Sequence, residues 1–341
     1  MKVLVTGATG FVGNHAARRL LSQGYSVRCL VRKTSRLNGL KALDAELCCG
    51  DVNDKDSLRR ALRGVDAVLH LASLVGETGR RQDFFRVNVE GTRNLLEVCG
   101  DVPLKKLIHM SSLSVITGDK DHHGTPEDAP YLRTGEPYAD TKIESERLVL
   151  QYRERYPLPA VILRPGFIYG PGDRLFLPAV IKNLREGKVI LIDGGKKILN
   201  LTHIDNLLDA VELALSKQEA DGETFNITDG EKISKREFFF TVADLINLPR
   251  PARSIPFFVA RAVCSAAATL YQILGIQKTP RLSRIKLRFA GQNQLFSIEK
   301  AEKVLGYVPR IRFQAGIREA VESCRDQIQS PAAEISLQEK E

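Results

Sequence analysis

The first half of the chain alternates short apolar runs with amphipathic stretches whose apolar residues recur at helical spacing. Helical patterns such as GNHAARRLLSQG and VNVEGTRNLLEVCG separate most of these runs. The strand-like runs cover residues 2–7, 25–31, 45–50, 66–73, 106–112 and 160–166. Strands that alternate with helices indicate right-handed βαβ units, in which helices cover both faces of a parallel sheet. The pattern therefore predicts an α/β fold with a doubly wound parallel sheet.

The second half follows a different pattern. Gly- and Pro-rich stretches at 170–173 and 192–197 interrupt it, and helical patterns dominate after residue 235. We expect an N-terminal domain and a smaller, interleaved C-terminal domain. The N-terminal domain covers 1–165 with 201–227 returning to it, the C-terminal domain covers 166–200 and 228–327, and a polar, aperiodic tail covers 328–341.

Composition and charge narrow the class of protein. Apolar residues make up 43% and charged residues 27% of the chain, which is ordinary for a globular protein with a sizeable core. The six scattered cysteines include no Cys-x-x-Cys pair, and the start MKVLVTGATG lacks a signal-peptide layout, so we expect a cytoplasmic protein with reduced thiols. The net charge of +9 suggests an anionic partner, but the basic residues are dispersed and aromatic residues reach only 6%, which argues against nucleic acid.

Three glycines, Gly7, Gly10 and Gly13, lie between the first predicted strand and the first predicted helix. Glycine permits the tight turn, lets backbone N–H groups approach a pyrophosphate, and lets the helix pack on the strand. The N-terminus of the helix then favours the anion. In this strand–turn–helix context, the trio predicts a dinucleotide-binding site and a sheet of the Rossmann type.

The end of the second predicted strand indicates which dinucleotide binds. An acidic residue there would hydrogen-bond the ribose 2′-hydroxyl of NAD, but this chain carries Arg32, Lys33 and Arg36. Cations favour the 2′-phosphate, so we expect NADP(H) to be preferred over NAD(H); the alternative is a solvated basic loop. Further contacts with the adenosine half are expected from Asp51, Val52, Leu71, Ala72 and Ser73.

A second candidate site is the pair Tyr138 and Lys142 in EPYADTKIESERL. Residues four apart share one face of a helix, so the phenol and the ammonium would lie together. The pair alone also fits a solvated helix face. Of the eight tyrosines only Tyr138 has a lysine four residues later, and it follows the predicted strand that ends at Ser112, which favours a catalytic pair.

Seven motifs in order resemble the extended short-chain dehydrogenase/reductases of the NAD-dependent epimerase/dehydratase superfamily. They are TGATGFVG, GDV, HLAS, VNVEGTRNLL, MSSLSV, YADTK and RPGFIYGPGD, and the similarity covers residues 1–325. Within that family, RPGFIYGPGD and GGKKILNLTHIDNLLDA look most like the branch of 3β-hydroxysteroid dehydrogenases, sterol-4-carboxylate dehydrogenases and dihydroflavonol reductases.

The resemblance implies a role for each residue of the site. Tyr138 would move the proton at the substrate oxygen, and Lys142 would lower the pKa of the phenol and hold the nicotinamide ribose. Ser112, with Ser111 as the alternate, would hydrogen-bond the substrate oxygen, and Asn88 would support the site. The remaining cofactor contacts are expected at Thr9, Phe11, Val12, Ser111, Tyr138, Lys142, Pro165, Gly166 and Ile168.

No metal site is expected. His70 and His109 lie inside predicted strands, where packing explains them better than metal ligation. His122 and His123 lie in a stretch that we expect to be a solvated loop, and His203 is expected to support the junction of the two domains.

Two departures from the nucleotide-sugar epimerases favour an apolar substrate. Gly166 stands where those enzymes usually carry asparagine, and Leu199-Asn200-Leu201 replaces an Arg-Asp-Phe-like run. We therefore expect a homodimeric, NADP(H)-preferring oxidoreductase that interconverts a hydroxyl and a ketone on a sterol-, β-keto-acid- or flavonoid-like molecule. The alternatives are a nucleotide-sugar epimerase or reductase, and a non-catalytic NAD(P)-binding sensor or assembly protein.

The apolar run 257–276 is long enough to suggest a membrane span. A narrow polar stripe indicates instead a helix that packs against protein or lies in a membrane interface; it consists of Arg261, Ser265, Thr269 and Gln272. The basic residues that follow could meet anionic head groups; they are Lys278, Arg281, Arg284, Lys286 and Arg288. We expect either peripheral contact of 257–288 with the inner face of a membrane, or a helix that only roofs the substrate pocket.

Overall fold

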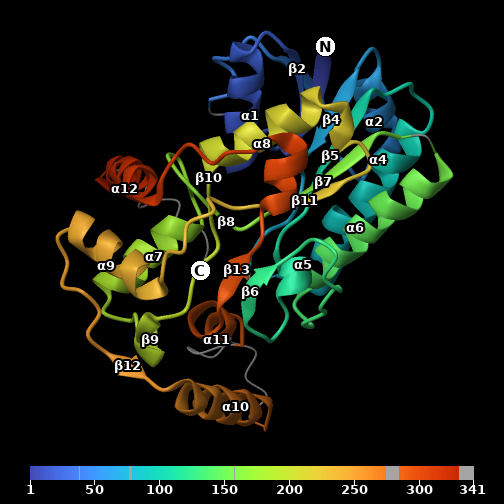
Figure 1. The fold of residues 1–341 in the computed structure, drawn as a ribbon. Coiled ribbons are helices and arrows are strands. Elements are labelled where there is room, and N and C mark those ends of the chain that lie inside the picture. Colours follow the sequence, from blue (N-terminus) through green and yellow to red (C-terminus); the bar gives the residue numbers. More distant parts are fainter. Residues whose placement is uncertain (38, 77–78, 157, 274–283, 330–341) are drawn as a thin grey trace.

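The computed structural model describes all residues except 38, 77–78, 157, 274–283 and 330–341. Within the described residues a seven-stranded sheet forms the centre of the molecule, and every pairing in it is parallel (Figure 1). In sheet order the strands are β11 (Thr224–Ile227), β7 (Ala160–Pro165), β5 (Lys106–Met110), β4 (Ala67–His70), β1 (Lys2–Thr6), β2 (Ser26–Val31) and β3 (Glu46–Cys49). This order confirms the predicted Rossmann-type α/β fold, and six of the seven strands match the apolar runs.

Helices cover both faces of the sheet because each turns an apolar face toward it. On one face, α1 (Phe11–Ser22) and α8 (Ile204–Ser216) pack on the sheet through residues such as Leu20 and Leu207. On the other face, α2 (Lys55–Leu62), α4 (Gly91–Cys99) and α6 (Pro137–Arg155) pack through residues such as Leu58, Leu95 and Val149. Six of these strands are consequently mostly buried and read as apolar runs, whereas the edge strand β3 is largely exposed.

The other elements described in the N-terminal half are α3 (Arg81–Phe84), the π-helical turn η1 (Phe85–Glu90), α5 (Ser114–Thr117) and β6 (His122–Thr125). Helix α3 and turn η1 pack against α6, whereas α5 and β6 follow the carboxyl end of β5 (Figure 1). Strand β6 pairs in parallel with β13 (Gln294–Phe296), so a segment near the end of the chain is joined to the segment that follows β5.

A second, smaller core lies beyond the carboxyl ends of the strands. Its described elements are β8 (Phe167–Tyr169), α7 (Phe176–Arg185), β9 (Leu191–Ile192), η2 (Asp193–Gly195), β10 (Leu201–His203), α9 (Lys235–Leu245), β12 (Ser254–Ile255), α11 (Arg284–Gly291) and α12 (Phe313–Gln329). Two further short helices, η3 (Gln218–Ala220) and η4 (Ala301–Leu305), flank β11. Between β7 and β11 the chain thus leaves the sheet, builds part of this second core, and returns.

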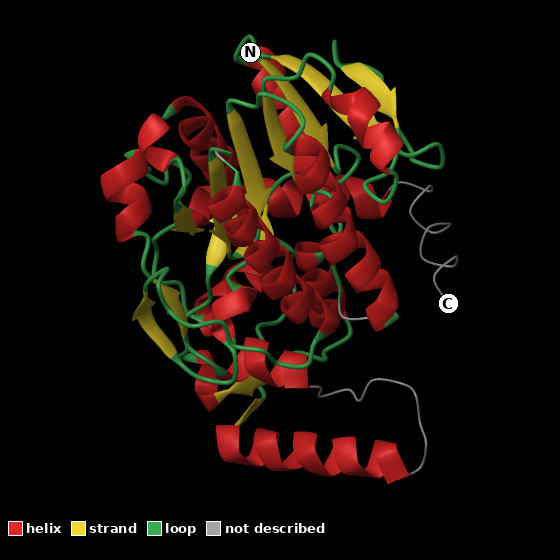
Figure 2. Ribbon diagram, turned by 90° about the vertical axis from the view of Figure 1, so that its right-hand side faces the viewer, coloured by secondary structure: helices red, strands yellow, loops and turns green. Residues whose placement is uncertain are grey.

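Helix α10 (Phe257–Ile273) lies at the outer edge of the smaller core, next to α11 and away from the sheet (Figure 2). Ala260 and Cys264 are buried, whereas Phe258 is 72% and Val263 51% exposed. Among the residues that the structure describes, no helix combines the length and apolarity needed to cross a bilayer.

Candidate active site

Helix α6 presents Tyr138 and Lys142 on the face that lies against the end of β5. Lys142 is 4% exposed, and its Nζ donates a hydrogen bond to the carbonyl oxygen of Met110 over 2.7 Å. The hydroxyl of Tyr138 interacts with the side chain of Ser112, two residues beyond Met110. Three of the four residues predicted to be catalytic therefore meet at the carboxyl edge of the sheet, where doubly wound proteins bind their ligands.

The two neighbouring serines differ in their surroundings. Ser111 is buried, and its Oγ donates to Oε2 of Glu146 over 2.5 Å. Ser112 is half-buried, and its Oγ accepts from the backbone N–H of Ser114 over 3.2 Å. The hydroxyl beside Tyr138 is thus that of Ser112, whereas that of Ser111 is engaged inside the protein.

Asn88 lies in the π-helical turn η1, and such turns often occur at functional sites. Its Oδ1 accepts from the N–H of Leu74 over 2.7 Å and from Oγ of Ser73 over 3.1 Å. Its Nδ2 donates to the carbonyl of Leu74 over 3.1 Å and to Oγ1 of Thr141 over 3.0 Å. Because Thr141 precedes Lys142, Asn88 ties the loop after β4 to the helix that carries the pair.

Burial controls the protonation of the Tyr138–Lys142 pair. It lowers the pKa of Lys142 to about 8, and the charge of Glu146 partly opposes that change. Burial also raises the pKa of Tyr138, while the interaction with Ser112 lowers it in part. The pKa of Tyr138 in the chain by itself is therefore raised, because desolvation of the phenolate is its largest cause. The lowering expected from Lys142 together with the positive nicotinamide ring stays a prediction for the enzyme with bound cofactor.

Two buried histidines lie near Lys142. Burial and the charge of Lys142 lower the pKa of His70 to about 3 and that of His109 well below 6.5, so both rings are neutral. His70 pairs with Oγ1 of Thr6 at 2.8 Å through Nδ1 and with Oγ1 of Thr92 at 3.0 Å through Nε2. Both histidines are packed beneath the site, as the strand positions predicted.

Two positions in the glycine-rich turn between β1 and α1 leave no space for a Cβ atom. Gly7 has a φ of +69°, and a Cβ there would lie 2.8 Å from the backbone nitrogen of Ala72. A Cβ at Gly13 would lie 2.2 Å from the carbonyl oxygen of Gly7. Helix α1 begins after Gly10 without a side-chain cap, and no acidic residue occupies its first turn. These features fit the pyrophosphate of a dinucleotide, which needs close backbone approach and free N–H groups.

The other residues predicted to contact the cofactor lie along the same edge. Thr9, Phe11 and Val12 are half-buried around the first turn of α1. Arg32, Lys33 and Arg36 are exposed after β2. The carboxylate of Asp51 accepts from the backbone and side-chain nitrogens of Asn53, both at 2.9 Å, and Val52 is buried. The N–H groups of Leu71 and Ala72 donate to Oγ1 of Thr6, at 3.2 and 3.1 Å.

The chain after β7 passes close to the smaller core. A Cβ at Gly166 would lie 2.4 Å from the carbonyl oxygen of Asn200, so this backbone leaves no room for the asparagine of the epimerases. Pro165 ends β7, and Ile168 lies in β8 opposite Thr202 of β10. Leu199 and Leu201 are buried in the smaller core. These leucines therefore face the protein interior, and their identity says nothing direct about a substrate.

Two sequence expectations are corrected by long-range contacts. His122 is 1% exposed rather than solvated, because its ring stacks on Phe296 of β13 and its Nε2 pairs with the carbonyl of Thr117 at 2.6 Å. Arg288 was one of the basic residues that could meet anionic head groups, but it is buried and pairs with Asp119 and Glu136. Lys278 and Arg281 lie outside the described residues, as do the side chains of Thr269 and Gln272.

His203 lies where β10 meets α8 and is fully buried. It packs edge-on against the ring of Tyr169 and its Nδ1 accepts from the N–H of Asp205 over 3.3 Å. Glu146 was not predicted as a site residue, although it follows Lys142 by the same four residues that separate Lys142 from Tyr138. That spacing was a visible signal.

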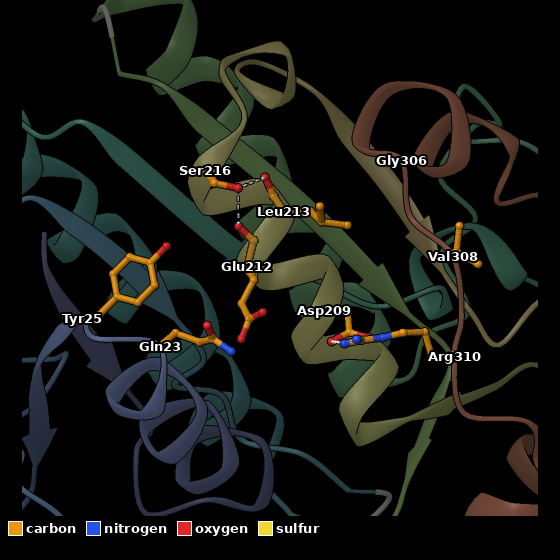
Figure 3. A pocket seen from close by; sticks show the side chains of 9 residues that line it. All are labelled: Gln23, Tyr25, Asp209, Glu212, Leu213, Ser216, Gly306, Val308 and Arg310. Carbon is orange, nitrogen blue, oxygen red and sulfur yellow. Dashed lines mark hydrogen bonds and ion pairs between the residues drawn. The ribbon is translucent and has the colours of Figure 1, made fainter.

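A separate pocket of about 590 Å³ lies on the side of the molecule formed by α1, α8 and residues 306–310 (Figure 3). Arg310 spans part of it and pairs with Asp209, while Tyr25, Glu212 and Val308 line other parts. None of the predicted catalytic or cofactor residues lines it, so it is distinct from the candidate active site.

The sheet, its glycine-rich turn and the tyrosine–lysine pair define an NAD(P)-dependent enzyme of the extended short-chain dehydrogenase/reductase type. The family model of the NAD dependent epimerase/dehydratase family matches residues 3–228, and the chain belongs to this family.

Relatives of known activity cover nearly the whole chain. The human sterol-4-alpha-carboxylate 3-dehydrogenase, decarboxylating, is 31% identical over 94% of this chain and 87% of that protein. A ketoreductase of Stigmatella aurantiaca that acts on 4-hydroxy-2-methyl-3-oxo-4-farnesyl-3,4-dihydroquinoline-1-oxide is 29% identical over 93% of this chain and 95% of that protein. The UDP-glucuronic acid 4-epimerase of Bacillus cereus, solved with UDP-glucuronic acid and NAD, superimposes with a TM-score of 0.76 at 25% identity, covering 96% and 99% of the two chains.

Proposed function

We propose that this protein is an NADP(H)-preferring oxidoreductase that interconverts a hydroxyl and a ketone on a hydrophobic small molecule. The observation that carries the proposal is the meeting of Ser112, Tyr138 and Lys142 at the carboxyl edge of the sheet. A sensor that only bound the dinucleotide would need the glycine-rich turn and not this set. The cofactor is assigned to 1–165 with 201–227, and the substrate to 166–200 with 228–327.

The chain's own groups supply the proton chemistry. Tyr138 gives its phenolic proton to the substrate oxygen in ketone reduction and takes it back in alcohol oxidation. Ser112 donates a hydrogen bond to the same oxygen and stabilises the charge that develops there. The ammonium of Lys142 favours the phenolate left on Tyr138 and binds the nicotinamide ribose. When bound, the nicotinamide supplies or accepts the hydride. Asn88 holds the helix in place without touching the reacting atoms.

The preference for NADP(H) rests on charge at the end of β2. Arg32 and Lys33 are exposed there, and neither of these positions holds the carboxylate that would select the free ribose hydroxyls of NAD. Charge-assisted hydrogen bonds from such cations suit a 2′-phosphate.

An apolar substrate is favoured by half-buried aromatic rings of the smaller core, which begin just after β7. Phe167, two residues after Pro165, stacks on Phe176 at 5.2 Å between ring centroids and meets Phe289 edge-on at 5.1 Å. All three rings are half-buried. They come from β8, α7 and α11, and a sterol-, β-keto-acid- or flavonoid-like molecule would cover such rings better than a sugar nucleotide would. The relatives named for sterol and ketone substrates support the same class.

A substrate panel tests the proposal. Purified protein is incubated with NADPH or NADP and with a 3β-hydroxysteroid, a 2-alkyl-3-oxoalkanoate or a dihydroflavonol, and the absorbance of NADPH is followed. We expect turnover of at least one of these and none of UDP-glucose or UDP-glucuronic acid. Epimerisation of a UDP-sugar would favour the runner-up, and mass spectrometry of co-purified small molecules extends the panel without bias. A chain that binds NADPH tightly and turns over no ketone or alcohol would be a sensor.

The proposal also includes an anionic lipid surface as a partner of α10. Phe258 and Val263 are exposed on this helix, and Arg284 is exposed on the next. Apolar side chains beside a cation suit the boundary between head groups and acyl chains.

A further inference from the structure

Glu146 continues the line of Tyr138 and Lys142 along α6 by one helical turn, and the mechanism above gives it no role. Its side chain is fully buried. Carboxylates are almost never buried to this extent unless they are paired and hydrogen-bonded, because removing the charge from water is costly. Its partners therefore indicate what it does.

Those partners come from three parts of the chain. Arg164 on β7, itself buried, donates from Nε to Oε1 over 3.0 Å and also bonds that oxygen through Nη2. Tyr131, in the loop after β6, donates to Oε1 over 3.0 Å. Ser111 donates to Oε2 over 2.5 Å. Every contact is donated to the carboxylate, which is the pattern of the ionised, acceptor-only form.

Three consecutive residues at the end of β5 consequently meet three residues of α6. The carbonyl of Met110 accepts from Lys142, the hydroxyl of Ser111 donates to Glu146, and the side chain of Ser112 interacts with Tyr138. Arg164 holds Glu146 from the next strand, so the middle contact is fixed from both sides. A shift of Ser111 would move both of its neighbours.

We propose that Glu146 is a positioning residue of this site, which fixes the strand end carrying Ser112 through Ser111 and keeps a negative charge one turn behind Lys142. The inference rests on the function proposed above for Tyr138, Lys142 and Ser112. It adds a residue that touches neither substrate nor cofactor.

The charge of Glu146 matters because the other titratable groups that face Lys142, among the residues that the structure describes, are neutral. Tyr138 lies one turn before it on α6, and His70 and His109 face it from β4 and β5. The two rings are neutral, and burial raises the pKa of the phenol, so it is neutral as well. Burial lowers the pKa of Lys142 to about 8, and Glu146 raises it. Without Glu146 the ammonium would be lost nearer to neutral pH.

The test replaces both members of the buried ion pair. Glu146→Gln alone would leave Arg164 buried and uncompensated, whereas Glu146→Gln with Arg164→Gln keeps the region neutral. NADPH binding, followed by fluorescence across pH, needs no substrate. We expect the pH above which affinity declines to fall by about one unit in the double variant. The alkaline limb of kcat/KM for a substrate from the panel should move in the same direction, with roughly a tenfold loss of kcat at neutral pH.

Glu144→Gln is the matched control, since Glu144 is on the same helix but partly exposed and paired with Arg133 and Arg147. It should leave both pH profiles unchanged. Ser111→Ala keeps the charge and removes the contact with β5, so kcat should fall several-fold without a shift in pH.

A double variant that melts cooperatively and keeps the wild-type pH profiles would overturn the inference. If the double variant does not fold, Ser111→Ala tests the inference instead, and a wild-type kcat in Ser111→Ala would contradict it. Tyr138→Phe is measured in parallel. Full activity of Tyr138→Phe would contradict the proposed function itself. The pH dependence of NADPH affinity would still report the effect of the charge of Glu146.

Discussion

The ammonium of Lys142 donates to the carbonyl oxygen of Met110 over 2.7 Å. That carbonyl belongs to the main chain of β5, so this hydrogen bond holds the charged end of Lys142 against the sheet and does not depend on a second side chain. Tyr138, one turn earlier, meets the side chain of Ser112 instead. The two residues of the pair are therefore held separately, and replacing one leaves the contact of the other in place.

Tyr138→Phe should abolish turnover and leave the dissociation constant of NADPH nearly unchanged, because only the transferable proton is removed. General acid–base catalysis contributes about 10²–10⁴-fold, so kcat should fall by at least that much. Lys142→Ala should damage both kcat and NADPH affinity, since the ammonium acts on the phenol and on the ribose. Steady-state kinetics with NADPH fluorescence titrations separate the two effects.

Tyr152→Phe is the control for this prediction, since Tyr152 lies on the same helix and stacks on Tyr156 away from the site. It should keep wild-type turnover. Wild-type turnover in Tyr138→Phe with any accepted substrate would contradict the proposed role of Tyr138 in proton transfer.

Deprotonation of Lys142 should make the folded protein more stable and the enzyme less active as the pH rises. Its pKa is about 8 when folded and 10.5 ordinarily, so between these values the unfolded chain binds more protons than the folded one. The contribution of Lys142 to stability therefore rises with pH in this window, while activity falls as the ammonium is lost. Lys142→Met should be more stable than wild type at neutral pH, by up to about 3 kcal/mol. Urea unfolding at several pH values would show a constant difference if the burial of Lys142 costs nothing.

The sequence predicted those features that depend on local spacing. The glycine-rich turn, the Tyr138–Lys142 pair and the six apolar strands each lie within a few consecutive residues, and the structure contains them. His122 could not be predicted in this way, because its burial results from pairing between β6 and β13, which are far apart in the chain. Glu146 needed the position of Ser111 on a different element, and the pKa of Tyr138 needed its desolvation, which no motif records.

Arg32 should give the enzyme tighter binding of NADPH than of NADH. Charge-assisted hydrogen bonds to a phosphate contribute a few kcal/mol at most, so a preference of roughly ten- to several-hundred-fold is expected. Arg32→Asp should remove most of that preference, because its carboxylate repels the 2′-phosphate and can bond a ribose hydroxyl. Titration of both cofactors measures the ratio, and Arg155→Asp, an equal charge change at the end of α6, should leave it unchanged. A wild-type preference for NADH would contradict the assignment.

Arg288 should stabilise the active-site helix from the smaller core. Its guanidinium donates to Asp119 over 2.9 and 2.7 Å and to Glu136, the residue just before α6, over 2.5 Å. Arg288→Gln should lower stability by about 1–2 kcal/mol and reduce kcat more than it weakens NADPH binding, because Glu136 lies two residues before Tyr138. Urea unfolding and kinetics measure both.

Arg284→Gln, an exposed change on the same helix, should stay within about 0.5 kcal/mol of wild type. Equal behaviour of the two variants would mean that the Arg288 contacts do not hold α6.

Exposed apolar side chains on α10 should bring the protein to anionic lipid. An apolar face gives marginal attachment, and each cation near an anionic surface adds about 1 kcal/mol, weakened by salt. The protein should co-sediment with phosphatidylserine-containing vesicles at low salt, release at high salt, and bind neutral vesicles poorly. Phe258→Ser with Arg284→Gln should weaken sedimentation, whereas Val308→Ser, at an apolar residue 68% exposed elsewhere, should not. Sedimentation that is the same with and without anionic vesicles would leave α10 as a roof of the substrate pocket, which needs the same apolar composition.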